Sequence, residues 1–119
     1  MPCLKIMTNI CKSKIPADFL VKIIPVLVEG VRKTSEKFLC VIEGDCALTI
    51  NGNTTLPGAI ATLESIGNLG PEDNKRIVQL LSAFLEKEIG VTSDRFFLTF
   101  YDLDAHYVAK NGLTVACFE

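Results

Sequence analysis

An internal repeat constrains the fold of this chain more than any other feature of its sequence. Residues 34–39 read Thr-Ser-Glu-Lys-Phe-Leu and residues 92–97 read Thr-Ser-Asp-Arg-Phe-Phe, so the second copy follows the first at a shift of 58 positions, from 34 to 92. Similarity at a constant shift is typical of a structural unit that occurs twice. We therefore predict two related halves, covering roughly residues 2–45 and 59–103, within one domain that spans residues 1–119.

Each half contains a segment with helical periodicity. Apolar side chains recur every three or four positions after Pro16 in the first half and after Pro71 in the second. Proline suits the first turn of a helix, because the N–H groups there have no intrahelical acceptor. Pro25 falls inside the first helix, where it removes a backbone hydrogen bond, so we expect a kink. Gly90 suits the end of the second helix, because glycine readily adopts the left-handed conformation found there.

Strand-like runs flank both predicted helices. They lie at residues 3–8 and 38–43 around the first helix, and at 59–66 and 96–101 around the second. Two shorter strands are expected at residues 48–50 and 114–118. Two strand-helix-strand units of this kind predict an α/β fold, a two-layer sandwich of one mixed sheet and two helices.

Two of the predicted strands are apolar on both faces. Residues 38–42 and 96–98 are apolar at odd and even positions alike, whereas a strand with one solvated face would alternate. Right-handed crossovers place both helices on the same side of the sheet, so its other side needs a different cover. We therefore predict a homo-oligomer that packs sheet against sheet.

Composition excludes several classes of function. The net charge of -2 arises from 14 acidic and 12 basic residues that are mixed along the chain, so a nucleic-acid partner is not expected. No segment is long and apolar enough to insert into a membrane, and the first residues do not form a secretory signal. We predict a cytoplasmic protein. The five cysteines form no CxxC motif and there is one histidine, so neither a metal nor another cofactor is predicted.

Several short motifs resemble the macrophage migration inhibitory factor family, a branch of the tautomerase superfamily. The motifs are Met1-Pro2 before a strand that ends in Thr8-Asn9, then Val31-Arg32-Lys33, Glu64-Ser65-Ile66-Gly67, and Ser93-Asp94-Arg95 before an aromatic strand. Their order and spacing extend the resemblance over nearly the whole chain. The segment at residues 112–118 is more similar to the D-dopachrome tautomerase branch. The resemblance implies a homotrimer.

The resemblance also implies that Met1 is removed and that Pro2 then acts as the general base and acid of a keto–enol tautomerase. An amide-bound proline nitrogen is not basic, whereas a free α-amino group titrates near ~8. Apolar surroundings and a nearby cation disfavour the protonated amine and lower its pKa, and Lys33 is the candidate cation. The implied substrate is a small enolisable aromatic keto acid of the phenylpyruvate or D-dopachrome type.

Further site residues follow from the same resemblance. Lys33 would bind the substrate carboxylate, and the backbone N–H of Ile66 would donate to it. Phe97, Thr99 and Val108 would line the pocket, partly from a neighbouring subunit.

Some positions depart from the family pattern. Phe97 and Thr99 stand where the family often has a tyrosine and an asparagine. Lys110 stands where the inhibitory factor has a tryptophan, and its charge would favour an anionic substrate. Gly58 and Ala61 replace the inhibitory factor's CxxC cysteines, so a thiol oxidoreductase is not expected.

Two other functions are compatible with these patterns. Family members leave cells without a signal peptide and engage the invariant chain receptor, so the resemblance also implies a secreted cytokine-like ligand with a vestigial pocket. Duplicated βαβ units build ferredoxin-like binding modules as well. Such a module would be a monomer or dimer without a pocket around the N-terminus, and the chain lacks the basic, aromatic sheet of an RNA binder.

Overall fold

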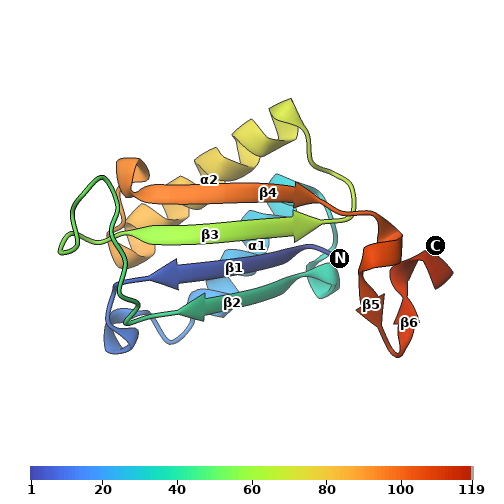
Figure 1. Cartoon of the computed structure of the whole chain (residues 1–119), viewed down its shortest axis with the longest axis horizontal. Helices are drawn as coiled ribbons and strands as arrows, with labels where there is room; N and C mark the ends of the chain where they lie inside the picture. The colour runs from blue at the N-terminus through green and yellow to red at the C-terminus, as the bar shows by residue number, and fades with distance from the viewer. Residues whose placement is uncertain (119) are drawn as a thin grey trace.

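One four-stranded sheet forms the first layer of the protein in the computed structural model, which describes residues 1–118 (Figure 1). The sheet has the strand order β2-β1-β3-β4. Strand β1 is parallel to β2 and antiparallel to β3, and β3 is parallel to β4, so the sheet is mixed. The strands are β1 (Cys3–Thr8), β2 (Leu39–Glu43), β3 (Ala59–Ser65) and β4 (Phe96–Asp102), each within one residue of its predicted bounds.

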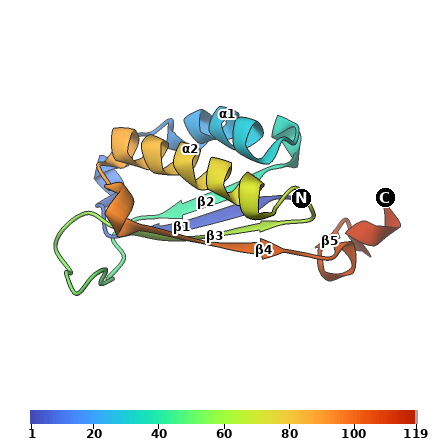
Figure 2. The same cartoon turned by 90° about the horizontal axis from the view of Figure 1, so that it is seen from above.

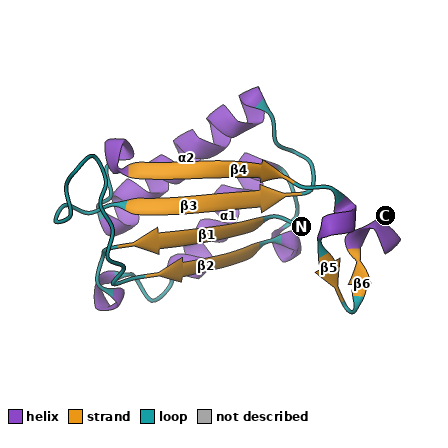
Figure 3. Cartoon of the chain, viewed as in Figure 1, coloured by secondary structure: helices purple, strands orange, loops and turns teal. Residues whose placement is uncertain are grey.

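Two helices form the second layer and lie side by side on one face of the sheet (Figure 2). Helix α1 (Phe19–Val31) continues through Pro25, so the proline does not end the helix. Pro25 is exposed to solvent. Pro16 lies before α1, in a turn in which its carbonyl accepts from the Phe19 N–H. The prediction that Pro16 occupies the first turn of the helix was therefore wrong. Helix α2 (Pro71–Ile89) begins at proline as predicted. The predicted two-layer α/β sandwich is confirmed (Figure 3).

The two halves repeat in backbone conformation as well as in sequence. Arg32 follows α1 with a φ of 61°, and Gly90 follows α2 with a φ of 70°, so both helices end in a left-handed residue. A 3-10 turn then comes before the next strand, at Ser35–Lys37 in the first half and at Ser93–Arg95 in the second. These elements are separated by the shift of the sequence repeat, from 32 to 90 and from 35 to 93.

The hydrophobic core lies between the sheet and the helices. Alternate residues of each strand face the helices, for example Leu4 and Ile6 of β1, each 1% exposed. The helices contribute residues at helical spacing, and Phe19 packs against Phe84 with ring centroids 5.3 Å apart. This packing explains why the apolar periodicity of the sequence predicts the helices well.

The other face of the sheet is covered by no described element, and we call it the open face. Its apolar side chains are between 40% and 57% exposed, and they are Met7, Leu39, Val41, Ile60, Phe97 and Tyr101. An ion pair between Lys5 and Glu64, with 3.4 Å between nitrogen and oxygen, also lies there. β2 and β4 are the strands with apolar residues at both odd and even positions. One set of alternate residues faces the helices, and the other set lies on the open face.

Two predicted strands are largely wrong. Residues 48–50 form no strand, because Asn51 and Gly52 have positive φ and turn the chain back, so Ile50 bridges only to Asn53. At the C-terminus, only a hairpin of β5 (Ala109–Lys110) and β6 (Leu113–Thr114) forms beyond the end of the sheet near the N-terminus (Figures 1 and 2). The Val115 N–H donates to the Val108 carbonyl at 2.7 Å, and the chain then turns into a 3-10 helix at Val115–Cys117 instead of continuing as a strand.

Candidate functional site

Pro2 lies at the start of β1, where the sheet, the segment after α1 and the C-terminal hairpin approach one another. The residue is buried, and its carbonyl accepts from the Leu39 N–H at 2.9 Å. This bond fixes Pro2 against the first residue of β2. With Met1 attached, the Pro2 nitrogen is part of a tertiary amide and cannot accept a proton.

Lys33 and Ile66 are in direct contact. Helix α1 ends at Val31, the left-handed Arg32 redirects the chain, and the Lys33 Nζ then donates to the Ile66 carbonyl at 2.6 Å. Both side chains are partly buried. The structure therefore brings together two residues that lie far apart in the sequence and that the resemblance assigned to one site.

The turn after Ile66 is anchored on two sides, by residues that the sequence reasoning missed. The Asn68 side chain donates to the Val31 carbonyl at 2.9 Å, which ties the turn to the end of α1. The Gly67 N–H donates to the Asp102 carboxylate at 3.0 Å, which ties it to the end of β4. Asparagine after glycine is a turn signal, but nothing in the sequence indicates which distant groups the turn contacts.

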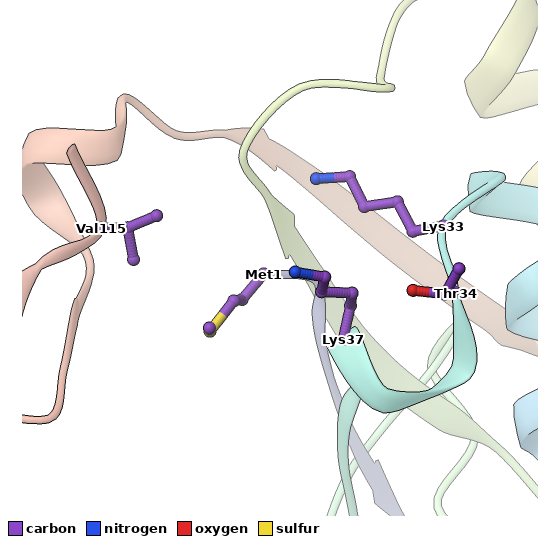
Figure 4. A pocket seen from close by; sticks show the side chains of 5 residues that line it. All are labelled: Met1, Lys33, Thr34, Lys37 and Val115. Atoms are coloured by element: carbon purple, nitrogen blue, oxygen red, sulfur yellow. The ribbon is translucent and has the colours of Figure 1, made fainter. Parts of the chain in front are cut away.

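A cavity of about 310 Å³ opens beside these residues (Figure 4). It is lined by Met1, Lys33, Thr34, Lys37 and Val115. In Figure 4 the Lys37 amine lies beside Met1, the Lys33 side chain extends toward the turn that follows β3, and Val115 lies across from both lysines. Because Met1 is bonded to Pro2, the cavity begins next to the predicted base.

A second cavity of about 300 Å³ also has Met1 in its wall. Its lining residues are Met1, Glu36, Lys37, Leu39, Val108, Ala109 and Lys110. Val108 lines the second cavity and not the first, and its role as a pocket residue stays a prediction. Met1 and Lys37 line both cavities.

Phe97 and Thr99 do not join this group within one chain. Both lie on the open face, where Phe97 is 54% exposed. Phe97 pairs with Ile60 near the start of β3, whereas Ile66 follows the far end of that strand. Phe97 lines a different cavity of about 260 Å³, together with Thr49, Ile50, Asn51 and Ile60. The contribution of Phe97 and Thr99 from a neighbouring subunit stays a prediction.

Cys3 and Glu36, two ionisable residues at this end of the sheet, have shifted pKa values. Burial raises the pKa of the Cys3 thiol, Lys5 opposes that shift, and Glu64 adds to it. Hydrogen bonds from the Thr34 hydroxyl and from its own backbone N–H, followed by the charge of Lys37, lower the pKa of Glu36. Glu36 therefore stays ionised at neutral pH, in the wall of the second cavity.

Among residues 1–118, no group of three or more histidine, cysteine or acidic side chains is arranged to hold a metal ion. Within the same residues, no helix has the length and apolar character needed to cross a membrane.

A family model described as macrophage migration inhibitory factor (MIF) matches residues 1–116. The chain belongs to the MIF family. It is similar to the MIF-like protein mif-2 of Caenorhabditis elegans, with 33% identity over 98% of this chain and 96% of that relative. It is equally similar to the macrophage migration inhibitory factor of Xenopus laevis, with 33% identity over 98% of this chain and all of the relative.

The structure of the macrophage migration inhibitory factor from Trichinella spiralis has the same fold. It superposes with a TM-score of 0.89 at 28% identity, over 94% of this chain and 98% of that one. The resemblance of the sequence motifs to the MIF family is therefore confirmed. Because the MIF family is part of the tautomerase superfamily, the chain's membership supports an isomerase of the tautomerase type. The ferredoxin-like alternative does not describe this MIF-family chain.

Proposed function

We propose that this protein is a keto–enol tautomerase of enolisable aromatic keto acids, of the phenylpyruvate or D-dopachrome type, with Pro2 as its general base and acid. The observation that carries the proposal is the hydrogen bond of 2.6 Å from the Lys33 Nζ to the Ile66 carbonyl, beside a cavity whose walls include Lys33 and Met1, the residue bonded to Pro2. A cation, backbone groups and the N-terminal proline are thereby gathered at one end of the sheet.

Removal of Met1 is the first step of this proposal. It would convert the Pro2 nitrogen from an amide into a secondary amine that can accept a proton. It would also open space, because Met1 lines both cavities. The buried position of Pro2 and the ammonium of Lys33 both disfavour a protonated amine, which would lower its pKa toward neutral pH.

The chemical step moves one proton and no net charge. The Pro2 amine takes the proton from the carbon next to the keto group, and the C–H electron pair becomes the new C=C bond. The carbonyl π pair moves to oxygen, the protonated Pro2 amine delivers to that oxygen the proton it has just taken, and the free amine is regenerated. The reverse sequence restores the keto form. Lys33 would hold the substrate carboxylate, and the Ile66 N–H would orient it.

Assembly as a homotrimer would complete the pocket. Phe97 and Thr99 lie on the open face, away from Pro2 of their own chain. Packing of the open face against a neighbour would cover its apolar side chains and bring these two residues to the neighbour's Pro2, while Val108 would come from the second cavity of the same chain.

The test combines intact mass with turnover of phenylpyruvate and D-dopachrome. We expect protein that has lost Met1 to be active, and the Pro2→Gly variant to lose about 100-fold or more in kcat, the contribution typical of a positioned base. Pro25→Ala is the matched control, because Pro25 is exposed in the middle of α1, away from the cavities. Full activity of processed Pro2→Gly would refute the role of Pro2.

A second function is favoured by the name of the Xenopus laevis relative, macrophage migration inhibitory factor. This chain would then be a secreted cytokine-like ligand that binds a cell-surface receptor of the invariant chain type. Surface plasmon resonance against the receptor ectodomain tests it. Binding that survives Pro2→Gly would assign signalling to the scaffold, and absence of wild-type binding would exclude this receptor.

A further inference from the structure

Each of the two cavities that Met1 lines also has two lysines in its wall. Lys33 and Lys37 line the first cavity, and Lys37 and Lys110 line the second. One ammonium group is sufficient to bind the single carboxylate of an aromatic keto acid. Lys37 and Lys110 therefore provide positive charge that the proposed reaction does not use.

The two lysines come from separate segments that converge. Lys37 is the last residue of the 3-10 turn that leads into β2, and Lys110 lies in β5, where it pairs with Leu113 across the hairpin turn. Both side chains are exposed, and neither forms an ion pair with any residue described here. The second cavity has its own apolar wall, made by Leu39, Val108 and Ala109. An apolar wall with two cationic groups fits an aromatic molecule that bears an acidic group.

Glu36 is the acidic residue that lines the second cavity, and its charge offsets only part of the positive charge of Lys37 and Lys110. Its carboxylate accepts from the Thr34 hydroxyl at 2.6 Å, and this bond lowers its pKa, so it carries a full negative charge. Three lysines against one glutamate leave a net charge of +2 on the walls of the two cavities. A substrate with two negative charges complements that balance.

We infer that the second cavity is an anion subsite, in which Lys37 and Lys110 bind a second acidic group of the substrate. The preferred substrates are aromatic keto acids that carry a further carboxylate at the far end of the ring. This inference rests on the proposed function, since it takes the keto acid end to be held by Lys33 next to Pro2. Lys37, which lines both cavities, is then a specificity-determining residue at their junction.

The experiment compares phenylpyruvate with para-carboxyphenylpyruvate, which differ by one carboxylate. Protein without Met1 is used, and kcat/KM is measured for both. We expect a ratio of about fivefold to tenfold in favour of the dianion at low salt, the size typical of one or two exposed ion pairs. The ratio is expected to approach one near ~1 M salt, where charges are screened beyond roughly 3 Å. A ratio near one at low salt overturns the inference.

Four variants distinguish the effect of charges that line the cavities from the effect of the protein's net charge. Lys37→Gln and Lys110→Gln are each expected to lower the ratio by about threefold, and Glu36→Gln to raise it by a similar factor. Lys87→Gln is the matched control, because Lys87 is an exposed lysine on α2, outside both cavities. An equal fall of the ratio in the control would show that net charge, and not the subsite, sets the preference, and would refute the inference.

Failure of the proposed function gives a different result. If neither keto acid is turned over, tautomerase activity toward this substrate class is refuted, and the subsite is decided by binding. Calorimetric titration of phenylacetate and para-carboxyphenylacetate then serves as the readout. Tighter binding of the dianion that weakens in Lys37→Gln and Lys110→Gln supports the subsite, whereas equal binding of the two acids overturns it.

Discussion

Arg95 and Lys37 occupy equivalent positions of the sequence repeat, yet their side chains have opposite surroundings. Arg95 is 4% exposed, and its guanidinium donates to the carbonyls of Ile50, Asn53, Leu56 and Pro57 at 2.7 to 3.2 Å. These bonds hold the loop between β2 and β3. Lys37 is exposed and lines the cavities. The same kind of charge is therefore structural in one half and available for binding in the other.

We expect Arg95→Met to lower the free energy of unfolding by roughly 3 kcal/mol, because several buried carbonyls would lose a charged donor. Urea unfolding followed by circular dichroism measures the change. Lys37→Met is the matched control and should change stability by less than about 0.5 kcal/mol, as is usual for an exposed position. Equal effects of the two substitutions would contradict the structural role of Arg95.

Cys40 links stability to alkaline pH. Burial, with a smaller contribution from Cys3, raises the pKa of Cys40 from 9.0 to about 12. In the unfolded chain the thiol ionises near 9.0, whereas in the native state it keeps its proton until about 12, so the native state binds more protons between these values. The contribution of Cys40 to stability is therefore fully present below pH 9.0 and is lost as pH rises toward 12.

The test follows urea unfolding of the wild type and of Cys40→Val from neutral to alkaline pH. We expect the unfolding free energy of the variant to fall less steeply with rising pH. Cys117→Val, at an exposed position, should keep the wild-type slope. Parallel curves for the wild type and Cys40→Val would show that the thiol does not ionise differently on unfolding.

At the level of secondary structure, the end of β2 depends on a close backbone approach at Gly44. A Cβ atom at this position would lie 2.8 Å from the Ile10 carbonyl oxygen and 3.1 Å from the Lys12 Cα. Backbone atoms cannot move away as a flexible side chain can. The glycine therefore lets the end of β2 pack against the segment that follows β1.

We expect Gly44→Ala to destabilise the protein by about 1–3 kcal/mol, the usual range for overpacking. Thermal or urea unfolding measures the loss. Gly30→Ala is the control, because a Cβ there would meet its nearest atom, the Ile77 Cγ1, at 3.4 Å, and alanine favours the helix, so it should be neutral or slightly stabilising. A neutral result for Gly44→Ala would mean that the two segments can separate at little cost.

At the scale of the whole molecule, we expect the open face to be the surface through which copies of the chain assemble. Val41 lies in its apolar surface and is 50% exposed, whereas Val21 on α1 is 74% exposed on the helical side. Burial of apolar area drives association, and a charge within such an interface opposes it. The two valines therefore provide a matched pair for testing the proposed trimer.

We expect wild-type protein to sediment as a trimer at micromolar concentration, Val41→Lys to shift toward the monomer, and Val21→Lys to remain trimeric. Sedimentation velocity distinguishes these states. Val41→Lys should also lose turnover if Phe97 and Thr99 of a neighbour complete the pocket. A monomeric wild type would refute sheet-to-sheet assembly, and a trimeric Val41→Lys would place the interface elsewhere.

Most of the fold follows from short-range patterns in the chain. The repeat, the helical periodicity and the strand-like runs predict both helices and the four strands of the main sheet, because each pattern reports which side of an element is buried. The prediction failed at residues 48–50 and 114–118. Strand formation there depends on a paired neighbour, and local turns remove it.

The candidate site was predictable in part, and through the family motifs only. These motifs implicate Lys33 and Ile66, which the structure joins by a hydrogen bond. Lys37 was missed, because the repeat aligns it with the buried Arg95 and both are simply basic residues in sequence.

Composition, periodicity and repetition thus account for the layers of this protein, because burial of apolar side chains acts on neighbours three or four positions apart in a helix and two apart in a strand. The cavities could be identified only from the three-dimensional structure, because their walls come from the N-terminus, the turn before β2 and the C-terminal hairpin. No local pattern encodes the distance between such segments. That distance results from the packing of the whole chain.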